Sequence, residues 1–297
     1  MSRPQIGFLV SGPKGFSLLQ GVHERCDVQF VSSHPVKGLQ VDAYADVGAF
    51  AATHGYPFLD RDALSPAVFE RASLVFVAGW QYLIAGAVDT LVVFHDSLLP
   101  ELRGFAPTVT ALISGKPRIG VSAFRPVAAF DAGPIYAQSA LDITYPIKIR
   151  DAYSALATRY TEAANLVLDA QATGQLHAKA QVETDATYSV WRGPEDYLID
   201  WSWSAERIQR FVNAVGWPYD GARTTYAGEA ITIDDVEPIG EMHFEDRHPG
   251  KVWKIEHGMP EIICGSGMVR IRSAHTRTGT PVVFSRVRET LGAITAR

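Results

Sequence analysis

Short apolar runs separated by segments of helical spacing fill the first half of the chain. The runs lie at 5–12, 27–33, 73–79 and 90–94, and they contain few charged side chains. Strands that helices cover on both faces are apolar along their whole length, as these runs are. The pattern therefore predicts an α/β domain with a mostly parallel sheet and helices on both of its faces.

The middle of the chain predicts two longer strands and two helices. The runs 118–124 and 133–143 indicate the strands, and the pattern over 105–115 indicates a short helix. The amphipathic pattern over 148–174 indicates a long helix closed by Gly174, since glycine readily adopts the left-handed conformation that often ends a helix.

The second part of the chain has a different composition, with more tryptophan and few aliphatic runs. Ser204 is a suitable N-cap for the helical pattern that follows it, and short β-runs broken by glycine come next. Such runs are typical of a small antiparallel barrel. The expected organisation is a first domain at 1–184, a linker at 185–203, and a second domain at 204–297 with a helix and a small OB-like β-barrel.

Length and composition place the chain among ordinary globular proteins. It has 297 residues, of which 47% are hydrophobic and 20% are charged, and this is enough for two domains with cores of their own. The net charge of −5 gives no general attraction to nucleic acid. No apolar segment approaches about 18 residues, so we expect no membrane span and a cytoplasmic location.

Several kinds of cofactor and metal site are not indicated. Cys26 and Cys264 lie far apart, and neither belongs to a C-x-x-C pair, so neither a disulfide framework nor a zinc site is predicted. The glycine-containing segment 12–16 matches neither the dinucleotide pattern G-x-G-x-x-G nor the P-loop pattern. The chain has no H-E-x-x-H motif, and we expect no metal.

The stretch LVVFHDSLLPELRGFAP, at 91–107, carries the candidate chemistry. Its predicted strand delivers His95 at the carboxyl end, which is where open α/β sheets build their sites. A lone histidine at a strand end more often bonds only the following loop. Asp131, in the segment FDAGPIY, changes this reading, because a carboxylate beside an imidazole would hold the ring in a fixed orientation for catalysis.

These residues resemble the family of folate-dependent formyltransferases, which includes methionyl-tRNA formyltransferase and sugar-nucleotide N-formyltransferases. The family motif His-x-Ser-Leu-Leu-Pro-x-x-Arg-Gly matches His95 to Gly104, and the family's catalytic Asp matches Asp131. The segment GWQYLI, at 79–84, is similar to the family segment that borders the folate pocket. The resemblance covers nearly the whole chain and implies a Rossmann-like formyltransferase sheet followed by the barrel domain.

The resemblance implies transfer of a formyl group from 10-formyltetrahydrofolate, as co-substrate, to an amine through a tetrahedral oxyanion. His95 would stabilise the oxyanion, and Asp131 would orient His95 and help to remove the ammonium proton. The residues expected to bind the folate are Gly79, Trp80, Gln81, Tyr82, Leu83, Ser97, Leu98, Leu99, Arg103, Gly104 and Asp131.

One residue departs from the family pattern. The family has an Asn two positions before the His, and this chain has Val93 there. Because alternate residues of a strand face the same side, Val93 lies where an oxyanion donor is expected and has none to offer. Loss of one such donor typically costs about 10²–10³ in rate. Either Gln81 or Ser97 supplies a substitute donor, or the chain is a slow, diverted or non-catalytic folate-binding relative.

The acceptor amine is the remaining question. Family members that act on initiator tRNA have a long basic loop after the second strand, whereas residues 32–50 read here as a loop with one lysine. The expected acceptor is therefore a small molecule, a nucleotide-linked amino sugar, and no nucleic-acid partner is expected. Methionyl-tRNA formyl transfer is the alternative, and the chain could pair as a homodimer. The residues expected to contact the acceptor are Asp96, Lys148, Arg150, Tyr188, Trp191 and Arg192.

Overall fold

The computed structural model describes residues 3–36, 40–84 and 88–292. The contacts between residues divide the chain into two compact units. The first comprises residues 1–108, 117–143 and 152–190, and the second comprises residues 109–116, 144–151 and 191–297. The expected linker and domain boundaries stay predictions.

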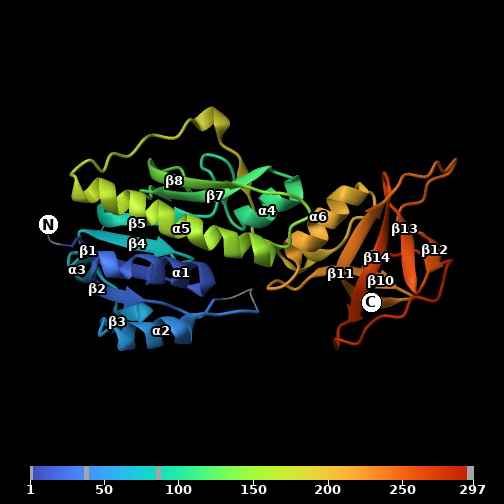
Figure 1. The fold of residues 1–297 in the computed structure, drawn as a ribbon, viewed down its shortest axis with the longest axis horizontal. Coiled ribbons are helices and arrows are strands. Elements are labelled where there is room, and N and C mark those ends of the chain that lie inside the picture. Colours follow the sequence, from blue (N-terminus) through green and yellow to red (C-terminus); the bar gives the residue numbers. More distant parts are fainter. Residues whose placement is uncertain (1–2, 37–39, 85–87, 293–297) are drawn as a thin grey trace. The chain divides into compact units, whose positions relative to one another are not determined.

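A sheet of seven strands, in the described part of the chain, forms the centre of the first unit (Figure 1). Its strands are β1 (Gln5–Val10), β2 (Asp27–Ser32), β3 (Phe58–Leu59), β4 (Leu74–Ala78), β5 (Leu91–His95), β7 (Arg118–Phe124) and β8 (Ile135–Asp142). Their order is β3-β2-β1-β4-β5-β7-β8. Pairing is parallel from β3 to β5, and β7 is antiparallel to both of its neighbours. The predicted mostly parallel sheet is confirmed.

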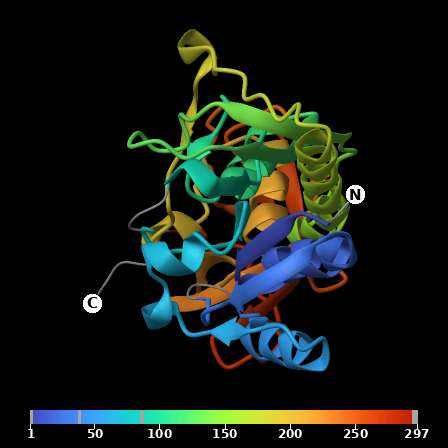
Figure 2. The ribbon, with the colours of Figure 1, turned by 90° about the vertical axis from the view of Figure 1, so that its left-hand side faces the viewer.

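The helices of this part of the chain are α1 (Gly12–Val22), α2 (Tyr44–Thr53), α3 (Pro66–Phe69), α4 (Pro107–Ser114) and α5 (Ile149–Ala172). Helix α1 contacts β1 and β4, and α2 contacts β3. Helices α1 and α5 lie side by side (Figures 1 and 2), and Arg25, just beyond α1, donates hydrogen bonds to Asn165 and Asp169 of α5. Helix α5 is the long helix predicted over 148–174, and its ends lie within one or two residues of the expected ones.

The prediction of a loop over 32–50 is wrong in its second half, because α2 begins at Tyr44. Val47 and Ala51, four residues apart, are buried along one side of this helix. The segment is rich in alanine, which has the highest helix propensity. The helical signal was therefore present in the sequence.

Side chains of the central strands alternate between the two faces of the sheet. On one face, Phe76 makes edge-to-face contacts with Phe8 and Phe94, and Phe94 lies 6.4 Å from the ring of Tyr160 on α5. Because residues two apart on a strand share a face, His95 lies on the opposite face, with Val93. This opposite face carries a buried apolar cluster formed by Leu9, Phe30, Val68, Phe69, Ala72, Val75, Val77 and Leu91.

A small parallel ribbon ties the turn after β5 to the segment that follows α5. It consists of β6 (Arg103–Gly104) and β9 (Tyr188–Ser189). Short 3-10 helices occupy His23–Arg25, Arg61–Ala63, Val88–Thr90, Glu183–Asp185 and Pro194–Tyr197. The ribbon brings the 181–189 segment against the residues that follow His95, which matters for the site below.

The second unit contains α6 (Ala205–Val215) and an antiparallel sheet. The sheet is formed by β10 (Ala222–Tyr226), β11 (Glu229–Ile239), β12 (Val252–Glu256), β13 (Met259–Ile263) and β14 (Met268–Thr276), in the order β10-β11-β14-β13-β12. Ser204 caps α6, since its side chain accepts a hydrogen bond from the Arg207 amide, as predicted. Closure of this sheet into an OB-like barrel stays a prediction.

Candidate active site

His95 is the last residue of β5 and is 8% exposed. Its Nε2 donates a hydrogen bond to the carbonyl oxygen of Leu102 at 2.9 Å. Its Nδ1 faces Oδ2 of Asp131 at 3.6 Å, which is close enough for electrostatic attraction but too long for a good hydrogen bond. The structure therefore brings together the two residues that the sequence singled out for catalysis.

Asp131 reaches His95 from the loop between β7 and β8. Its Oδ2 accepts a hydrogen bond from the Gly104 amide at 2.7 Å. Asp131 has a φ of 48°. Leu102, whose carbonyl oxygen accepts the hydrogen bond from His95, has a φ of 58°. Left-handed backbone at residues other than glycine costs about 1–3 kcal/mol and tends to occur at functional sites. Both loops that meet at His95 are thus held in unusual conformations.

A compact hydrogen-bond network fixes the turn after β5. The Ser122 hydroxyl donates to the Ser97 carbonyl at 2.7 Å and accepts from the Leu99 amide at 3.0 Å. Gln138 donates to the Leu99 carbonyl at 2.9 Å. Leu98 lies against Gly120, where a Cβ would come within 2.5 Å of its side chain. These residues hold the turn rigidly relative to β7 and β8.

The hypothesis that Ser97 replaces the missing oxyanion donor does not agree with this geometry. The Ser97 hydroxyl donates to the Glu101 carbonyl at 2.7 Å, and Ser97 is 4% exposed. A hydroxyl has one proton to donate, and here that proton stabilises the turn. The other candidate, Gln81, is exposed on the segment after β4, and its backbone amide donates to Nε2 of His34 at 3.4 Å.

Arg103 was expected to contact folate, and the structure shows its side chain bonded to the 181–188 segment instead. It is 1% exposed. Its Nε donates to Gln181 at 3.1 Å, and its Nη1 donates to both carboxylate oxygens of Glu183, at 3.0 and 2.9 Å. The hydroxyl of Tyr188 lies 3.4 Å from the same nitrogen. Arg103 therefore anchors the protein's own chain, and Gly104 contributes its amide to Asp131.

Asp96 was expected to contact the acceptor; the structure shows its Oδ2 bonded within the protein, and a role toward the acceptor stays a prediction. Its Oδ2 accepts from the Lys14 ammonium and from the Thr108 hydroxyl, both at 2.6 Å. Burial alone would raise the pKa of Asp96, but the positive charges of Lys14 and His95 and the two hydrogen bonds lower it to about 2. Through Oδ2, Asp96 therefore links α1, the turn after β5 and Thr108.

Val93 packs against the apolar cluster of the sheet and pairs across strands with Val77 and Phe124. It is partly buried. The position at which the family has an asparagine is therefore a packing position in this chain.

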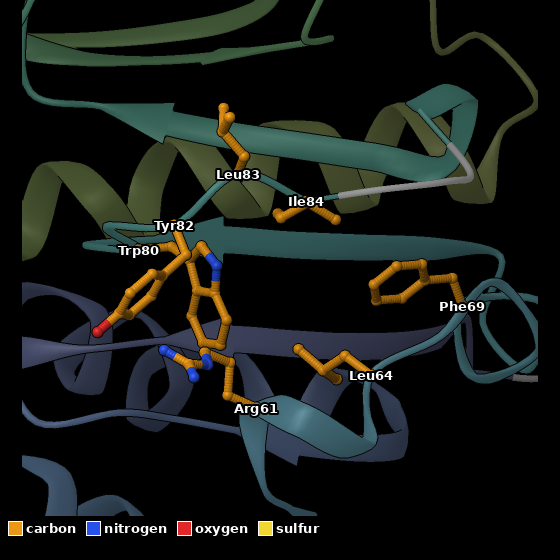
Figure 3. A pocket seen from close by; sticks show the side chains of 7 residues that line it. All are labelled: Arg61, Leu64, Phe69, Trp80, Tyr82, Leu83 and Ile84. Carbon is orange, nitrogen blue, oxygen red and sulfur yellow. The ribbon is translucent and has the colours of Figure 1, made fainter.

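Figure 3 shows the side chains that line a cavity of about 320 Å³. Three of them, Leu64, Trp80 and Ile84, pack against the same apolar cluster as Val93, so the cavity lies on the face of the sheet that carries Val93 and His95. It is lined by Arg61, Leu64, Phe69, Trp80, Tyr82, Leu83 and Ile84. Three residues expected to bind folate, Trp80, Tyr82 and Leu83, are among these. The residues expected from the turn after β5 are not part of this lining. The neighbouring position 79 requires glycine, because φ there is 67° and a Cβ would lie 2.1 Å from the Ser11 carbonyl oxygen.

Two residues at this cavity were not predicted from the sequence: Arg61, which lines it, and His34, whose ring contacts two of the lining side chains. The Arg61 guanidinium lies 4.4 Å from the centre of the Tyr82 ring. His34 is buried just after β2, with its ring 4.8 Å from that of Trp80 and 4.7 Å from that of Tyr82. His34 follows the carboxyl end of a parallel strand, and the same reasoning that selected His95 would have selected it.

The other residues expected to contact the acceptor lie mostly in the second unit. Lys148, Arg150, Trp191 and Arg192 belong to that unit, whereas Tyr188 belongs to the first. Arg150 is exposed and forms an ion pair with Asp151 at 3.5 Å. Tyr188 is 63% exposed and Trp191 is 69% exposed. Their assignment to the acceptor stays a prediction.

Within the described residues, no group of three or more His, Cys, Asp and Glu side chains is placed to hold a metal ion. In the same part of the chain, no helix combines the length and the apolar character needed to cross a membrane.

A histidine and an aspartate that meet at the carboxyl edge of a mostly parallel sheet, on the face that bears an apolar cavity, define the site of an α/β enzyme. The particular class follows from comparison with known families. Residues 60–170 match the formyl transferase family, and residues 193–286 match the formyl transferase C-terminal domain. The chain belongs to the formyl transferase family.

Individual relatives agree with this assignment. Methionyl-tRNA formyltransferase of Methylobacillus flagellatus is 28% identical over 268 residues, which cover 86% of this chain and 85% of the relative. HypX from Aquifex aeolicus, in complex with tetrahydrofolic acid, has a TM-score of 0.63 at 17% identity, covering 93% of this chain and 45% of HypX. An N-formyltransferase from Helicobacter canadensis, in complex with folinic acid and dTDP-3-aminofucose, has a TM-score of 0.63 at 13% identity, covering 91% of this chain and 99% of that protein.

The depressed pKa of Asp96 predicts a stability contribution that depends on pH. A carboxylate with a pKa of about 2 in the folded state, against an ordinary value of 3.8, stabilises the fold above about pH 4, and the effect is lost as the pH falls toward 2. Urea unfolding should show that Asp96→Asn is less stable than the native protein by about 2 kcal/mol at pH 7. The difference should shrink between pH 4 and pH 3. A difference independent of pH would contradict the ion-pair explanation.

Replacement of Val93 by asparagine should reduce stability or formyl transfer. The new amide would replace a side chain that packs against apolar neighbours, and an unsatisfied buried polar group costs about 1–3 kcal/mol. Val93→Leu, which has the same branching at Cγ as Asn but no amide, is the matched control. Thermal unfolding and turnover of both variants test this. A clear gain in transfer by Val93→Asn at native stability would show instead that the site merely lacks a donor.

Proposed function

We propose that this protein transfers a formyl group from 10-formyltetrahydrofolate to the primary amine of a small acceptor, a nucleotide-linked amino sugar. The observation that carries the proposal is the His95–Asp131 pair, with its 3.6 Å contact, on the cavity face of the sheet. In this reaction the amine nitrogen forms a bond to the formyl carbon, and the bond from that carbon to the folate nitrogen breaks. The proton that the amine loses is balanced by the proton that the folate nitrogen gains, so the products are the formamide and tetrahydrofolate.

His95 and Asp131 supply the two kinds of assistance that this reaction requires. The His95 imidazole, held at the end of β5, is the group that stabilises the developing oxyanion and moves a proton. Asp131 has a side chain that is 20% exposed, so its carboxylate is accessible to the acceptor's ammonium group and can take the proton that must leave before the amine attacks. Its hydrogen bond from the Gly104 amide keeps that carboxylate directed at His95.

The cavity on the same face suits a folate donor. Folates carry a fused planar ring, an aromatic spacer and a carboxylate-bearing tail. Trp80 and Tyr82 offer aromatic surfaces for the planar parts, Phe69 and Ile84 offer apolar contacts, and Arg61 offers a positive charge for the tail. The complexes of HypX with tetrahydrofolic acid and of the Helicobacter canadensis enzyme with folinic acid support this choice of donor.

Two exposed aromatic residues flank the Asp131–Gly104 hydrogen bond. Phe105 follows Gly104 and is 53% exposed, and Phe130 precedes Asp131 and is 69% exposed. Their ring centres lie 6.2 Å apart. Aromatic side chains in this position would contact a base or the face of a sugar close to the reactive amine, which supports an acceptor of the sugar-nucleotide class.

Methionyl-tRNA is the second candidate acceptor, and the relative from Methylobacillus flagellatus favours it. Two observations favour the small acceptor. The chain has a net charge of −5, and the segment 32–50 contains one lysine. Binding of tRNA requires contacts from positive side chains to several phosphates.

An assay with 10-formyltetrahydrofolate and a panel of acceptors tests the proposal. Nucleotide-linked amino sugars should be formylated, and methionyl-tRNA should be a poor substrate. His95→Asn and Asp131→Asn should each lower the rate by about 10²-fold or more, because each removes a group that assists the transition state. Circular dichroism should be unchanged. A near-native rate for His95→Asn would remove that residue from the mechanism.

A crossed pair of variants should separate donor binding from acceptor binding. Tyr82→Ala removes an aromatic surface of the cavity and should weaken binding of a stable folate analogue by about ten-fold, without changing the KM for the acceptor. Phe130→Ala should raise the acceptor KM and leave folate binding unchanged. Both side chains are exposed, so the fold should tolerate the changes. Fluorescence titration and steady-state kinetics give the two readouts, and no folate binding up to millimolar concentration would refute the donor assignment.

A further inference from the structure

The side chain of Gln181 meets the backbone of the Asp131 loop with all of its polar atoms engaged. Its Nε2 donates hydrogen bonds to the carbonyl oxygens of Asp131 and Gly133, each at 2.7 Å. Its Oε1 accepts from Nε of Arg103 at 3.1 Å. An amide has two protons and one oxygen, so Gln181 is oriented unambiguously by these three partners.

The loop that Gln181 bonds is tightly folded at Asp131 and Gly133. Asp131 has a φ of 48°, a conformation that residues other than glycine rarely adopt. At Gly133 a Cβ would lie 1.7 Å from the Arg125 carbonyl, so the two sides of the loop approach as closely as backbone allows. The side chain of Phe130, next to Asp131, is largely exposed and contributes little packing to the loop. Hydrogen bonds to its backbone therefore restrain Asp131 together with the Gly104 amide, which holds its carboxylate.

Arg103, which donates to the Gln181 side chain, is itself held in place. The guanidinium is buried, and its charge is balanced by two hydrogen bonds to the carboxylate of Glu183. The residue after it, Gly104, donates its amide to the Asp131 carboxylate. Two routes therefore join residues 103–104 to Asp131. The Arg103 side chain bonds Gln181, which bonds the Asp131 carbonyl, and the Gly104 amide bonds the Asp131 carboxylate. We call this closed set of contacts the ring.

We propose that Gln181 is a positioning residue, which fixes the backbone of Asp131 so that its carboxylate stays directed at His95. The inference rests on the proposed function, in which these two side chains carry out formyl transfer. Gln181 itself does not need to touch either substrate. Loss of its two N–H donors should therefore displace Asp131 relative to His95 and slow the chemical step without weakening substrate binding.

Two substitutions at Gln181 separate positioning from stability. Gln181→Glu keeps an acceptor for Arg103, with added charge attraction, and loses both donors to the Asp131 loop. Gln181→Met keeps the side chain neutral, and it also loses both donors. Gln175→Glu, on the exposed segment after α5, is the control for the charge change. The kcat of both Gln181 variants should fall by about 10- to 100-fold, with each KM within about two-fold of the native value.

The inference is overturned if Gln181→Glu folds and retains near-native kcat, or if its main effect is on KM. Should neither Gln181 variant fold, Glu183→Gln tests the same ring from the surface, since that side chain is 73% exposed. A lower kcat at unchanged KM supports the inference there, and a native kcat overturns it.

A spectroscopic readout distinguishes failure of this inference from failure of the proposed function. In protein labelled with ¹⁵N-histidine, the imidazole signals of His95, assigned with His95→Asn, should move in both Gln181 variants and stay in place in Gln175→Glu. Unchanged His95 signals in both variants overturn the positioning role. If the native protein transfers no formyl group to any acceptor, the proposed function fails, and the NMR comparison still decides whether Gln181 controls the His95–Asp131 geometry.

Discussion

The hydrogen bond from the Gly104 amide to the Asp131 carboxylate, 2.7 Å long, is the contact on which the site depends. His95 ends β5 and is followed by the turn that contains Leu102, whereas Asp131 lies in the loop between β7 and β8. Leu102 and Asp131 each have left-handed backbone. Such conformations persist only where surrounding contacts determine them. The Gly104 amide joins the two loops at the carboxylate itself, so the separation of Asp131 from His95 is set by the same contact that holds both strained segments together.

Charged side chains beside the site serve mainly to fix its framework. Asp96 is neutralised by Lys14, and Arg103 by Glu183, and each pair joins segments that are distant in sequence. Arg103 is buried whereas Glu183 is largely exposed, and both members of the Lys14–Asp96 pair are mostly buried. Loss of the carboxylate in either pair would leave a cation poorly solvated, which is unfavourable. These pairs therefore oppose movement of the turn after β5, and the anionic parts of a ligand must be met by other groups.

The sequence predicted the central sheet and the His–Asp pair because both depend on local patterns. Continuous apolar runs identify buried parallel strands, and the end of a parallel strand identifies the edge at which His95 lies. The hydrogen-bond partners of Asp96, Ser97 and Arg103 could not be predicted in this way. Each has a side chain that suits a ligand, and its partners come from α1, from within the turn, and from the segment after α5. Only the folded chain shows that these groups are already bonded.

Val93 has a consequence for how the transition state is stabilised. The residue packs against the apolar cluster that adjoins the cavity, so this chain has packing where the family has an amide donor. The Ser97 proton is used within the turn. Of the two nitrogens of His95, Nδ1 faces Asp131 and Nε2 donates to the Leu102 carbonyl. The Nε2 proton is therefore the one that the ring can redirect to a developing oxyanion. We infer that replacing the amide donor with valine leaves most of the electrostatic stabilisation to the His95–Asp131 pair.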